Sequence, residues 1–177
     1  AKELGCTEIV VHNGFKPNTS FYEGWVKNAT IFWQEFFEGK DDSITMMIEN
    51  QCEEDCEVLK MEIDSVNDSI LKVCLDIGHA HANSNMKVEN WISNLGDRIG
   101  YLHLHNNHGK VEGRPAFKND EHHCLDIGTM DMEKVLDLLE KNCPDAIWNI
   151  ECKLPELQNS LDVLEKYNFI KESSKIL

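Results

Sequence analysis

The feature that most constrains the fold is a regular alternation of short apolar runs with longer segments of helical periodicity. Five runs rich in β-branched or large apolar residues follow one another: EIVVHN (8–13), ITMMIEN (44–50), KVCLDIG (72–78), IGYLHLHN (99–106) and AIWNIEC (146–152). Runs that are apolar nearly throughout are typical of buried parallel strands. The alternation therefore predicts an α/β fold in which helices cover a parallel sheet.

Helices are predicted between the runs, where apolar residues recur every three or four positions. One face of the first predicted helix is aromatic, which we interpret as core packing: Phe21, Trp25, Phe32, Trp33 and Phe36. The predicted helices cover residues 21–36, 58–70, 88–95, 132–141 and 157–167. At 177 residues the chain is too short for two ordinary domains, so we expect five βα units in one domain, 1–177.

Composition narrows the classes of partner. The chain has 17 Lys and Arg against 32 Asp and Glu, a formal charge of -15. Such a surface repels phosphate backbones, which disfavours a nucleic-acid partner. No apolar run approaches the ~18 residues of a membrane span, which predicts no membrane partner.

The seven cysteines are odd in number and mostly lie in apolar segments, which predicts reduced, buried thiols and a cytoplasmic location. For Cys52 and Cys56 two interpretations stay open, half of a metal site or plain thiols near a helix start.

Each predicted strand ends in polar residues of a kind that binds metal ions or moves protons: His12, Glu49, Asp76 with His79, His103 with His105, and Glu151. In parallel α/β folds, and above all in (β/α)8 barrels, the carboxyl ends of the strands converge on the face where the active site forms. The strand ends are therefore predicted to form a common site.

Four of these residues, one at each end of successive strands, would offer three carboxylates and one imidazole: Glu49, Asp76, His103 and Glu151. Such a set suits Mn, Mg, Co or Zn. Carboxylates so close raise one another's pKa unless a cation lies between them. We therefore predict a divalent metal at this point; separate solvated carboxylates are the alternative.

An outer set could bind additional metal or orient a substrate: His12, His79, Asp120 and His122. Two of its members come from the motif DEHHCLDIG (120–128), inside the longest irregular segment, 106–130. Loops of that length in compact domains are usually functional or disordered, and we favour a functional one. Asp120 and His122 are two residues apart and can both turn toward the strand ends, whereas His123 should face away and pack or cap.

The number of units is itself informative. Five βα units cannot close a barrel of eight, and the opening AKELGC is typical of the end of a helix leading into a strand. We therefore expect the C-terminal part of a larger barrel, with N-terminal βα units missing. Uncovered sheet edges invite association, so self-association is also expected.

Six motifs occur in an order and spacing that resemble those of one known superfamily: VVHNGF, MMIEN, CLDIGHAH, YLHLHNN, DEHHCLDIGTMD and WNIEC. The sequence resembles the xylose isomerase-like TIM barrel superfamily, which includes sugar phosphate isomerases and epimerases and the endonuclease IV type of apurinic-site nuclease. The likeness spans essentially the whole chain and implies a partial (β/α)8 barrel made of strands four to eight.

The resemblance also implies roles for residues. It makes Glu49, Asp76, His103 and Glu151 a shared metal quartet, and in the sugar epimerases the two glutamates of that quartet also move protons. In endonuclease IV the counterparts of His12, His79, Asp120 and His122 also bind zinc. This chain departs from the nuclease pattern after Glu49, where ENQCEE adds negative charge, and at Asn106, where an aspartate is common.

Three hypotheses about function follow. The first is a divalent-metal-dependent isomerase or epimerase of a sugar or sugar phosphate, in which Glu49 and Glu151 transfer protons through an enediolate. The second is a metal-dependent phosphodiesterase that acts at abasic sites in DNA, which the negative charge disfavours. The third is a truncated fragment that binds metal without turnover.

Overall fold

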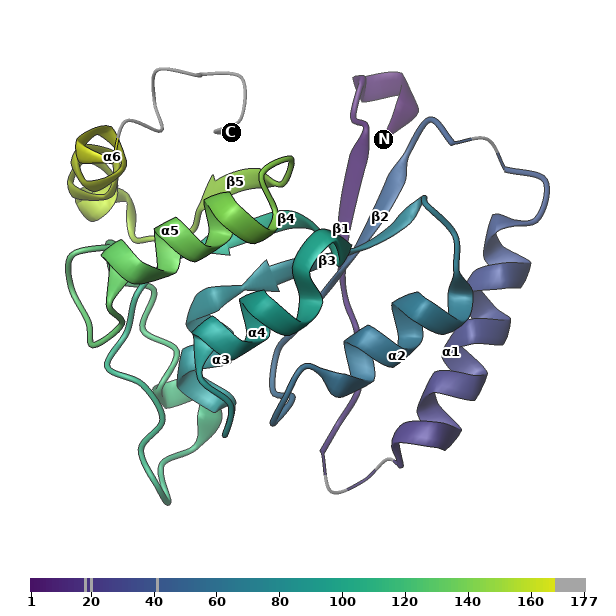
Figure 1. Ribbon diagram of the computed structural model, residues 1–177, viewed down its shortest axis with the longest axis horizontal. Coiled ribbons are helices and arrows are strands. Elements are labelled where there is room, and N and C mark those ends of the chain that lie inside the picture. The colour runs from purple at the N-terminus through teal and green to yellow at the C-terminus, as the bar shows by residue number, and fades with distance from the viewer. Residues whose placement is uncertain (18, 20, 41, 168–177) are drawn as a thin grey trace.

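Five parallel strands form one curled sheet, a half-barrel, in the computed structural model, which describes residues 1–17, 19, 21–40 and 42–167 (Figure 1). The strands are hydrogen-bonded in chain order: β1 (Glu8–His12), β2 (Thr45–Glu49), β3 (Leu71–Asp76), β4 (Ile99–Leu104) and β5 (Ile147–Ile150). All pairs are parallel. The predicted partial (β/α)8 barrel with five parallel strands is confirmed.

Each strand is followed by one or two helices, and residues of these helices share a core cluster with the sheet. The helices are α1 (Tyr22–Phe37), α2 (Glu57–Val66), α3 (Ile77–Asn83), α4 (Val88–Leu95), α5 (Met132–Asn142) and α6 (Leu157–Lys166). In Figure 1, α2, α4 and α5 lie across one face of the sheet. The predicted helix 58–70 is too long at its C-terminal end. The helix stops at Val66 because Asn67 takes the left-handed conformation, with φ 51°, that ends many helices.

Helix α3 was not predicted, because residues 77 and 78 were assigned to the preceding strand. The strand instead ends at Asp76, whose carboxylate accepts a hydrogen bond from the backbone N–H of His79 (2.7 Å). Aspartate at this position caps a helix N-terminus by satisfying a free N–H group. The chain therefore turns directly from strand into helix at Asp76.

The two faces of the sheet differ in chemistry. Apolar strand residues pack with the helices in the main core, among them Ile48, Val73, Leu75, Leu102 and Leu104. Side chains alternate along a strand, so the intervening residues point to the concave face, where Glu49, Cys74, Asp76 and His103 lie outside that core cluster. The helices thus bury one face, and the other presents ionisable groups near the carboxyl ends of the strands.

The aromatic face of α1 is only partly core, so that interpretation was too broad. Trp33 is buried, but Phe21 and Phe32 are exposed. Helix α1 packs against α2, and Phe32 of α1 and Val11 of β1 both line an apolar cavity. Phe32 therefore borders open space instead of filling the core.

The described cysteines are all free thiols. Cys56, Cys74, Cys124 and Cys143 are buried as predicted, whereas Cys6 is exposed. Cys52 and Cys56 contact the Phe15 carbonyl and the Met86 sulfur instead of each other. Burial raises the pKa of both thiols, which favours the interpretation as plain thiols over a metal half-site.

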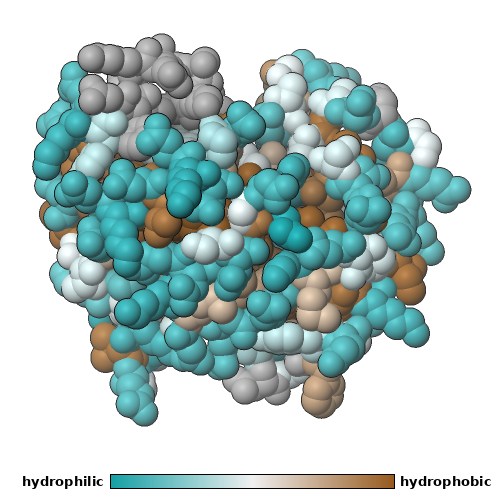
Figure 2. Space-filling view, in the orientation of Figure 1, coloured by the Kyte–Doolittle hydropathy of each residue, from teal (hydrophilic) through white to brown (hydrophobic). Residues whose placement is uncertain are grey.

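Hydrophilic residues cover most of the face in Figure 2, with hydrophobic residues visible between them. Within the described part of the chain, none of the helices combines the length and the apolar character that crossing a bilayer requires.

Candidate active site

Three residues from neighbouring strands meet at the carboxyl end of the sheet. Asp76 is level with His103 in the β3–β4 pairing, and Glu49 ends the adjacent strand β2. The Nδ1 atom of His103 lies 3.2 Å from Oε1 of Glu49 and 3.8 Å from Oδ2 of Asp76. One donor atom from each of the three lies within 4.8 Å of the others. All three residues are buried, so the strands hold this first group in a fixed arrangement.

Glu151 and His12 lie at the border of the first group. Oε1 of Glu151 is 3.4 Å from Nε2 of His103, on the opposite nitrogen from Glu49, and the Glu151 side chain is 31% exposed. Nε2 of His12 is 3.4 Å from Oε2 of Glu49, and its ring is largely exposed. The structure thus brings the four residues of the predicted quartet into one network of contacts, with Glu151 as the member most open to solvent.

A second group adjoins the first and consists of His79, His105, Asp120 and His122, again with one donor atom from each within 4.8 Å of the rest. Three of these belong to the outer set predicted from sequence. The fourth predicted member, His12, contacts Glu49 instead. Nε2 of His79 lies 3.3 Å from Asp120, and Asp120 lies 3.1 Å from Nε2 of His122.

His105 was not predicted as a site residue, although it was noted as a strand-end histidine. Its ring is fully buried, with Nε2 3.0 Å from Oδ1 of Asp76, and it stacks on the ring of His122 at a centroid distance of 4.0 Å. The available signal was its spacing: His105 is two residues after His103, so both side chains leave the chain on the same face.

Backbone contacts hold the long loop against the sheet end and so bring Asp120 and His122 into reach. Asn106 and His123 exchange two N–H···O bonds of 3.0 Å in an isolated antiparallel bridge. His122 has a positive φ of 48°, and its Nδ1 lies 2.8 Å from the Glu151 carbonyl. The loop thereby links the ends of β4 and β5.

Asn50 supports the group from behind. Its amide nitrogen donates to the Asp76 carbonyl, and its side-chain oxygen accepts from the Asp76 N–H, both at 2.9 Å. The Asn50 carbonyl lies 2.8 Å from Nδ1 of His79. A buried amide that makes two hydrogen bonds in this way fixes the backbone from which the Asp76 side chain projects.

Charges within the two groups shift one another's pKa. Burial works against ionisation of Asp76, but the facing imidazoles of His105 and His103 outweigh it and hold the pKa of Asp76 far below its usual value. Burial also works against charging His103, yet hydrogen bonds to Asp76, Cys74 and Glu49 raise its pKa well above the usual value.

The loop residues behave in the same way. For His79, burial is outweighed by the Asp120 hydrogen bond and the Asp76 charge, which raise its pKa to about 10. The hydrogen bond to Asp120 raises the pKa of His122 to about 9. Burial opposes ionisation of Asp120, but its bonds to His122 and His79 prevail and lower its pKa. The carboxylates in this region therefore require nearby positive charge, which protons or a metal ion can provide.

Two buried atoms that could bind a metal ion have no hydrogen-bond partner among the described residues: Nδ1 of His105 and Oδ1 of Asp120. Unsatisfied buried polar atoms are rare and ask for an explanation such as an ion. The donors are carboxylate oxygens and imidazole nitrogens, which suit divalent ions such as zinc or manganese. Both groups fit a divalent cation.

Comparison with known proteins identifies the family. Residues 1–172 match the family described as "Xylose isomerase-like TIM barrel". The chain belongs to this family. An uncharacterized protein of Methanocaldococcus jannaschii, MJ1614, is 35% identical over 96 residues, which are 54% of this chain and 31% of that protein.

Two solved structures are similar in fold. The xylose isomerase domain protein of Planctomyces limnophilus has a TM-score of 0.69 and 18% identity, and the match covers 92% of this chain and 58% of that one. The D-allulose 3-epimerase of a Methylomonas species has a TM-score of 0.64 and 19% identity, with 90% and 56% covered. The chain thus spans little more than half the length of these structures.

Proposed function

We propose that this chain is part of a divalent-metal-dependent isomerase or epimerase that acts on a sugar or sugar phosphate. The observation that carries the proposal is the placement of two carboxylates about one imidazole. Glu49 lies 3.2 Å from Nδ1 of His103, and Glu151 lies 3.4 Å from Nε2 of the same ring. A reaction that removes a proton from one carbon and returns one elsewhere needs two groups that exchange protons, and these two carboxylates are the candidates.

Each of the four residues at the strand ends has a role in this reaction. Glu49, Asp76 and His103 would hold the ion, and Glu151 is the more exposed fourth member, which lies against the other nitrogen of His103. A divalent ion in that position supplies Lewis-acid polarisation of a carbonyl and its neighbouring hydroxyl. One glutamate, Glu49 or Glu151, takes the proton from the carbon next to the carbonyl. The other returns a proton to the adjacent carbon or to the opposite face of the enediolate.

Burial supports different roles for the two glutamates. Glu49 is almost fully enclosed, and it contacts His12, His79 and His103. Glu151 follows the last residue of β5 and is partly open to solvent. Glu151 is therefore the carboxylate better placed to meet an incoming sugar. The D-allulose 3-epimerase of similar fold acts on a ketose according to its name, which is why ketoses are the first substrates to test.

Metal binding is tested first. Mn²⁺ and Zn²⁺ are titrated calorimetrically into the metal-free chain and into Glu49→Gln. A matched control is Glu62→Gln, which changes another buried glutamate that belongs to neither group. We expect Glu49→Gln to weaken binding by roughly tenfold or more, because a charged ligand becomes neutral, and Glu62→Gln to bind as the parent does. Equal affinity in all three proteins would rule out the proposed centre.

Proton transfer is tested by incubating ketoses and ketose phosphates with the metal-loaded protein in deuterated water. Deuterium should enter at the carbon next to the carbonyl. Loss of a general acid or base usually costs about 10²-fold to 10⁴-fold in rate, so Glu151→Gln should slow the exchange by at least ~10²-fold while metal affinity falls far less. Exchange at the parental rate in Glu151→Gln would remove this residue from the mechanism.

A second candidate function is metal-dependent phosphodiester hydrolysis. It is favoured by the second group, because His79 and His105 both contact Asp76 of the first group, and clustered metal ions are used in hydrolysis of phosphodiesters. The charge of -15 opposes a polyanionic substrate. Cleavage of an abasic duplex without deuterium exchange would favour this function over the first. Metal binding with neither reaction would favour the non-catalytic alternative.

A further inference from the structure

The motif DEHHCLDIG contains a second pair of donors that the sheet-end groups do not use. Asp120 and His122 point toward His79 and His105. Glu121 and His123 alternate with them and lie outside both groups. Their neighbour is His108, which stands just beyond β4. The Nδ1 atom of His108 is 2.8 Å from Oε2 of Glu121, and the rings of His108 and His123 are 5.8 Å apart.

From this arrangement we propose that His108, Glu121 and His123 form a separate zinc site on the outer side of the loop. One donor atom from each lies within 4.8 Å of the other two. Ligand atoms in a tetrahedral zinc site are roughly 3.3 Å apart, given Zn–N and Zn–O bonds of about 2.0 to 2.2 Å. Small side-chain rotations therefore close the site. Two imidazoles and one carboxylate are zinc donors, and the fourth position is left to water.

The backbone presets this geometry. The bridge between Asn106 and His123 holds the two segments antiparallel, and His108 and Glu121 each lie two residues from it. The N–H of His108 also donates to Oε2 of Glu121 at 2.9 Å. Two ligands thus come from the motif and one from the end of β4, so a bound ion would join the two segments in addition to the bridge.

The proposed site is open to solvent, and one of its imidazole nitrogens has no hydrogen-bond partner among the described residues. His108 is 55% exposed at its side chain, so an ion can enter from solvent. The Nδ1 atom of His123 is buried without a hydrogen-bond partner among the described residues, and Oε2 of Glu156 lies 3.5 Å from it. A carboxylate beside a ligating imidazole commonly accepts the N–H of the nitrogen that does not bind the metal. Glu156 is placed for that role.

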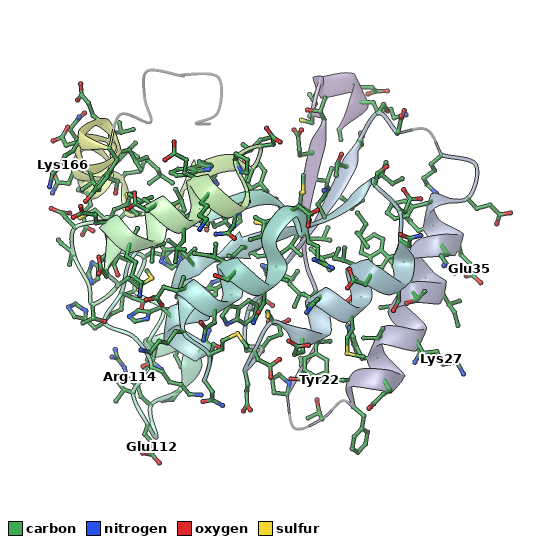
Figure 3. All side chains as sticks on the ribbon, viewed as in Figure 1. Tyr22, Lys27, Glu35, Glu112, Arg114 and Lys166 are labelled. Atoms are coloured by element: carbon green, nitrogen blue, oxygen red, sulfur yellow. The ribbon has the colours of Figure 1, made fainter. Side chains whose placement is uncertain are left out.

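One positive group lies nearby without blocking the site. The guanidinium of Arg114, labelled in Figure 3 near the tip of the loop, is 3.9 Å from Oε1 of Glu121. The proposed ligand atom is the other oxygen, which contacts His108.

The site has a consequence for the loop. Glu121 and His123 flank His122, and Glu121 directly follows Asp120, so fixing Glu121 and His123 on the outer side fixes Asp120 and His122 on the inner side. A zinc ion here would act as a structural clamp that presents the second group to the sheet end. The proposal is independent of the proposed sugar chemistry, because its ligands belong to neither sheet-end group.

The test uses tag-free full chain and Zn²⁺ alone. Zinc stoichiometry is measured by competition with a chromogenic chelator for the parent, His108→Ala, His123→Ala and Glu49→Gln. The matched control is His81→Ala, because His81 bonds Thr129 and belongs to none of the three groups. We expect His108→Ala and His123→Ala each to lose one zinc equivalent, whereas Glu49→Gln and His81→Ala keep that equivalent.

Amide hydrogen exchange gives a second measurement that does not depend on activity. Zinc should slow exchange across residues 106–123 in the parent and in Glu49→Gln, but not in His108→Ala. Because His108 is largely exposed, its replacement leaves the core untouched. Unchanged stoichiometry in both His108→Ala and His123→Ala would overturn the outer site. Loss of zinc only in Glu49→Gln would overturn it as well, while supporting the sheet-end centre.

Discussion

The pKa values of two buried carboxyl groups in this molecule are shifted in opposite directions. Glu62 on α2 is 1% exposed, and Asp76 at the end of β3 is 0% exposed. Burial dominates for Glu62 and raises its pKa to about 7, despite a 2.7 Å hydrogen bond from Nε1 of Trp33. For Asp76 the surrounding histidines reverse the effect of burial and lower its pKa.

The difference teaches that burial alone does not mark a functional carboxylate. Glu62 lies where α2 meets Trp33 of α1, and Oε2 has no hydrogen-bond partner among the described residues. A carboxyl group in such a place is most stable when protonated. Asp76 faces three imidazoles and remains an anion. Only in the environment of Asp76 can a metal ion take the place of the protons on the facing imidazoles.

The largest effect is expected from Asp76→Ala. The change removes the helix cap of α3 and leaves His79, His103 and His105 without their shared carboxylate, and breaking buried charge pairs costs about 3 to 5 kcal/mol. Urea unfolding of the metal-free protein at pH 7 measures the loss. Asp76→Asn is the control, because asparagine also caps helices but carries no charge. If the alanine variant were as stable as the asparagine variant, the cap would contribute nothing.

The Glu62 environment should appear as a pH-dependent stability. The unfolded-state carboxyl titrates near 4.5 and the folded one near 7, so between these values the unfolded state loses its proton first. Stability from this group is therefore fully present below about pH 4.5 and is lost as the pH rises to about 7, by about 3 kcal/mol in total.

The variant Glu62→Gln isolates this contribution. The difference in unfolding free energy between Glu62→Gln and the parent should rise in favour of the variant from pH 4.5 to 7 and then stay level. Other groups titrate equally in both proteins and cancel in the difference. A difference that does not change with pH would mean that Glu62 has an ordinary pKa.

A smaller effect is expected where the backbone approaches the second group. A Cβ atom added at Gly78 would lie 2.0 Å from Cε1 of the buried His105 ring. Gly78→Ala must therefore displace this ring from Asp76, and we expect a loss of about 1 to 3 kcal/mol, as for other overpacked sites. Thermal unfolding measures the loss, and chelator competition should show weaker zinc binding. If Gly78→Ala had the thermal stability and the zinc affinity of the parent, the His105 ring would be free to move aside.

The smallest effect, of opposite sign, is expected at Gly24 in α1. Apart from the adjoining residues and the backbone of α1 itself, no atom of the described residues lies within 4 Å of a Cβ added there. Gly24→Ala should therefore stabilise the helix by about 0.5 to 1 kcal/mol because alanine loses less backbone freedom. This variant is the matched control for Gly78→Ala in the same unfolding experiment. Destabilisation of Gly24→Ala would indicate that α1 packs differently in solution.

Much of the fold was predictable because strand and helix periodicities are local properties of the sequence. The five strands lie where apolar runs occur, and the ends of α4 and α5 agree with the predicted ranges within a residue. Helix α3 was missed because Ile77 and Gly78 extend an apolar run, and only the capping bond from Asp76 to His79 shows that the strand has ended.

The sequence indicated most of the residues that meet at the strand ends, but not how they divide into two groups. The strand ends point Glu49, Asp76 and His103 to one place, as strand parity requires. His105 was not assigned to the site, although its position two residues after His103 places it on the same face. The spacing in DEHHCLDIG predicted that Asp120 and His122 turn inward and that His123 faces away, as the contacts of these residues show. The Asn106–His123 bridge, a contact between residues 17 apart, holds them in that arrangement.

The sequence by itself determined the parallel half-barrel and the polar chemistry of its strand ends, because side-chain alternation and hydrophobic periodicity act over a few residues. Tertiary structure decided which ligands face one another. The β3–β4 register shifts between Val73 and Cys74, so that Asp76 lies level with His103 and not with Leu102. Such a shift depends on packing between strands that are distant in the chain, and local sequence carries no record of it.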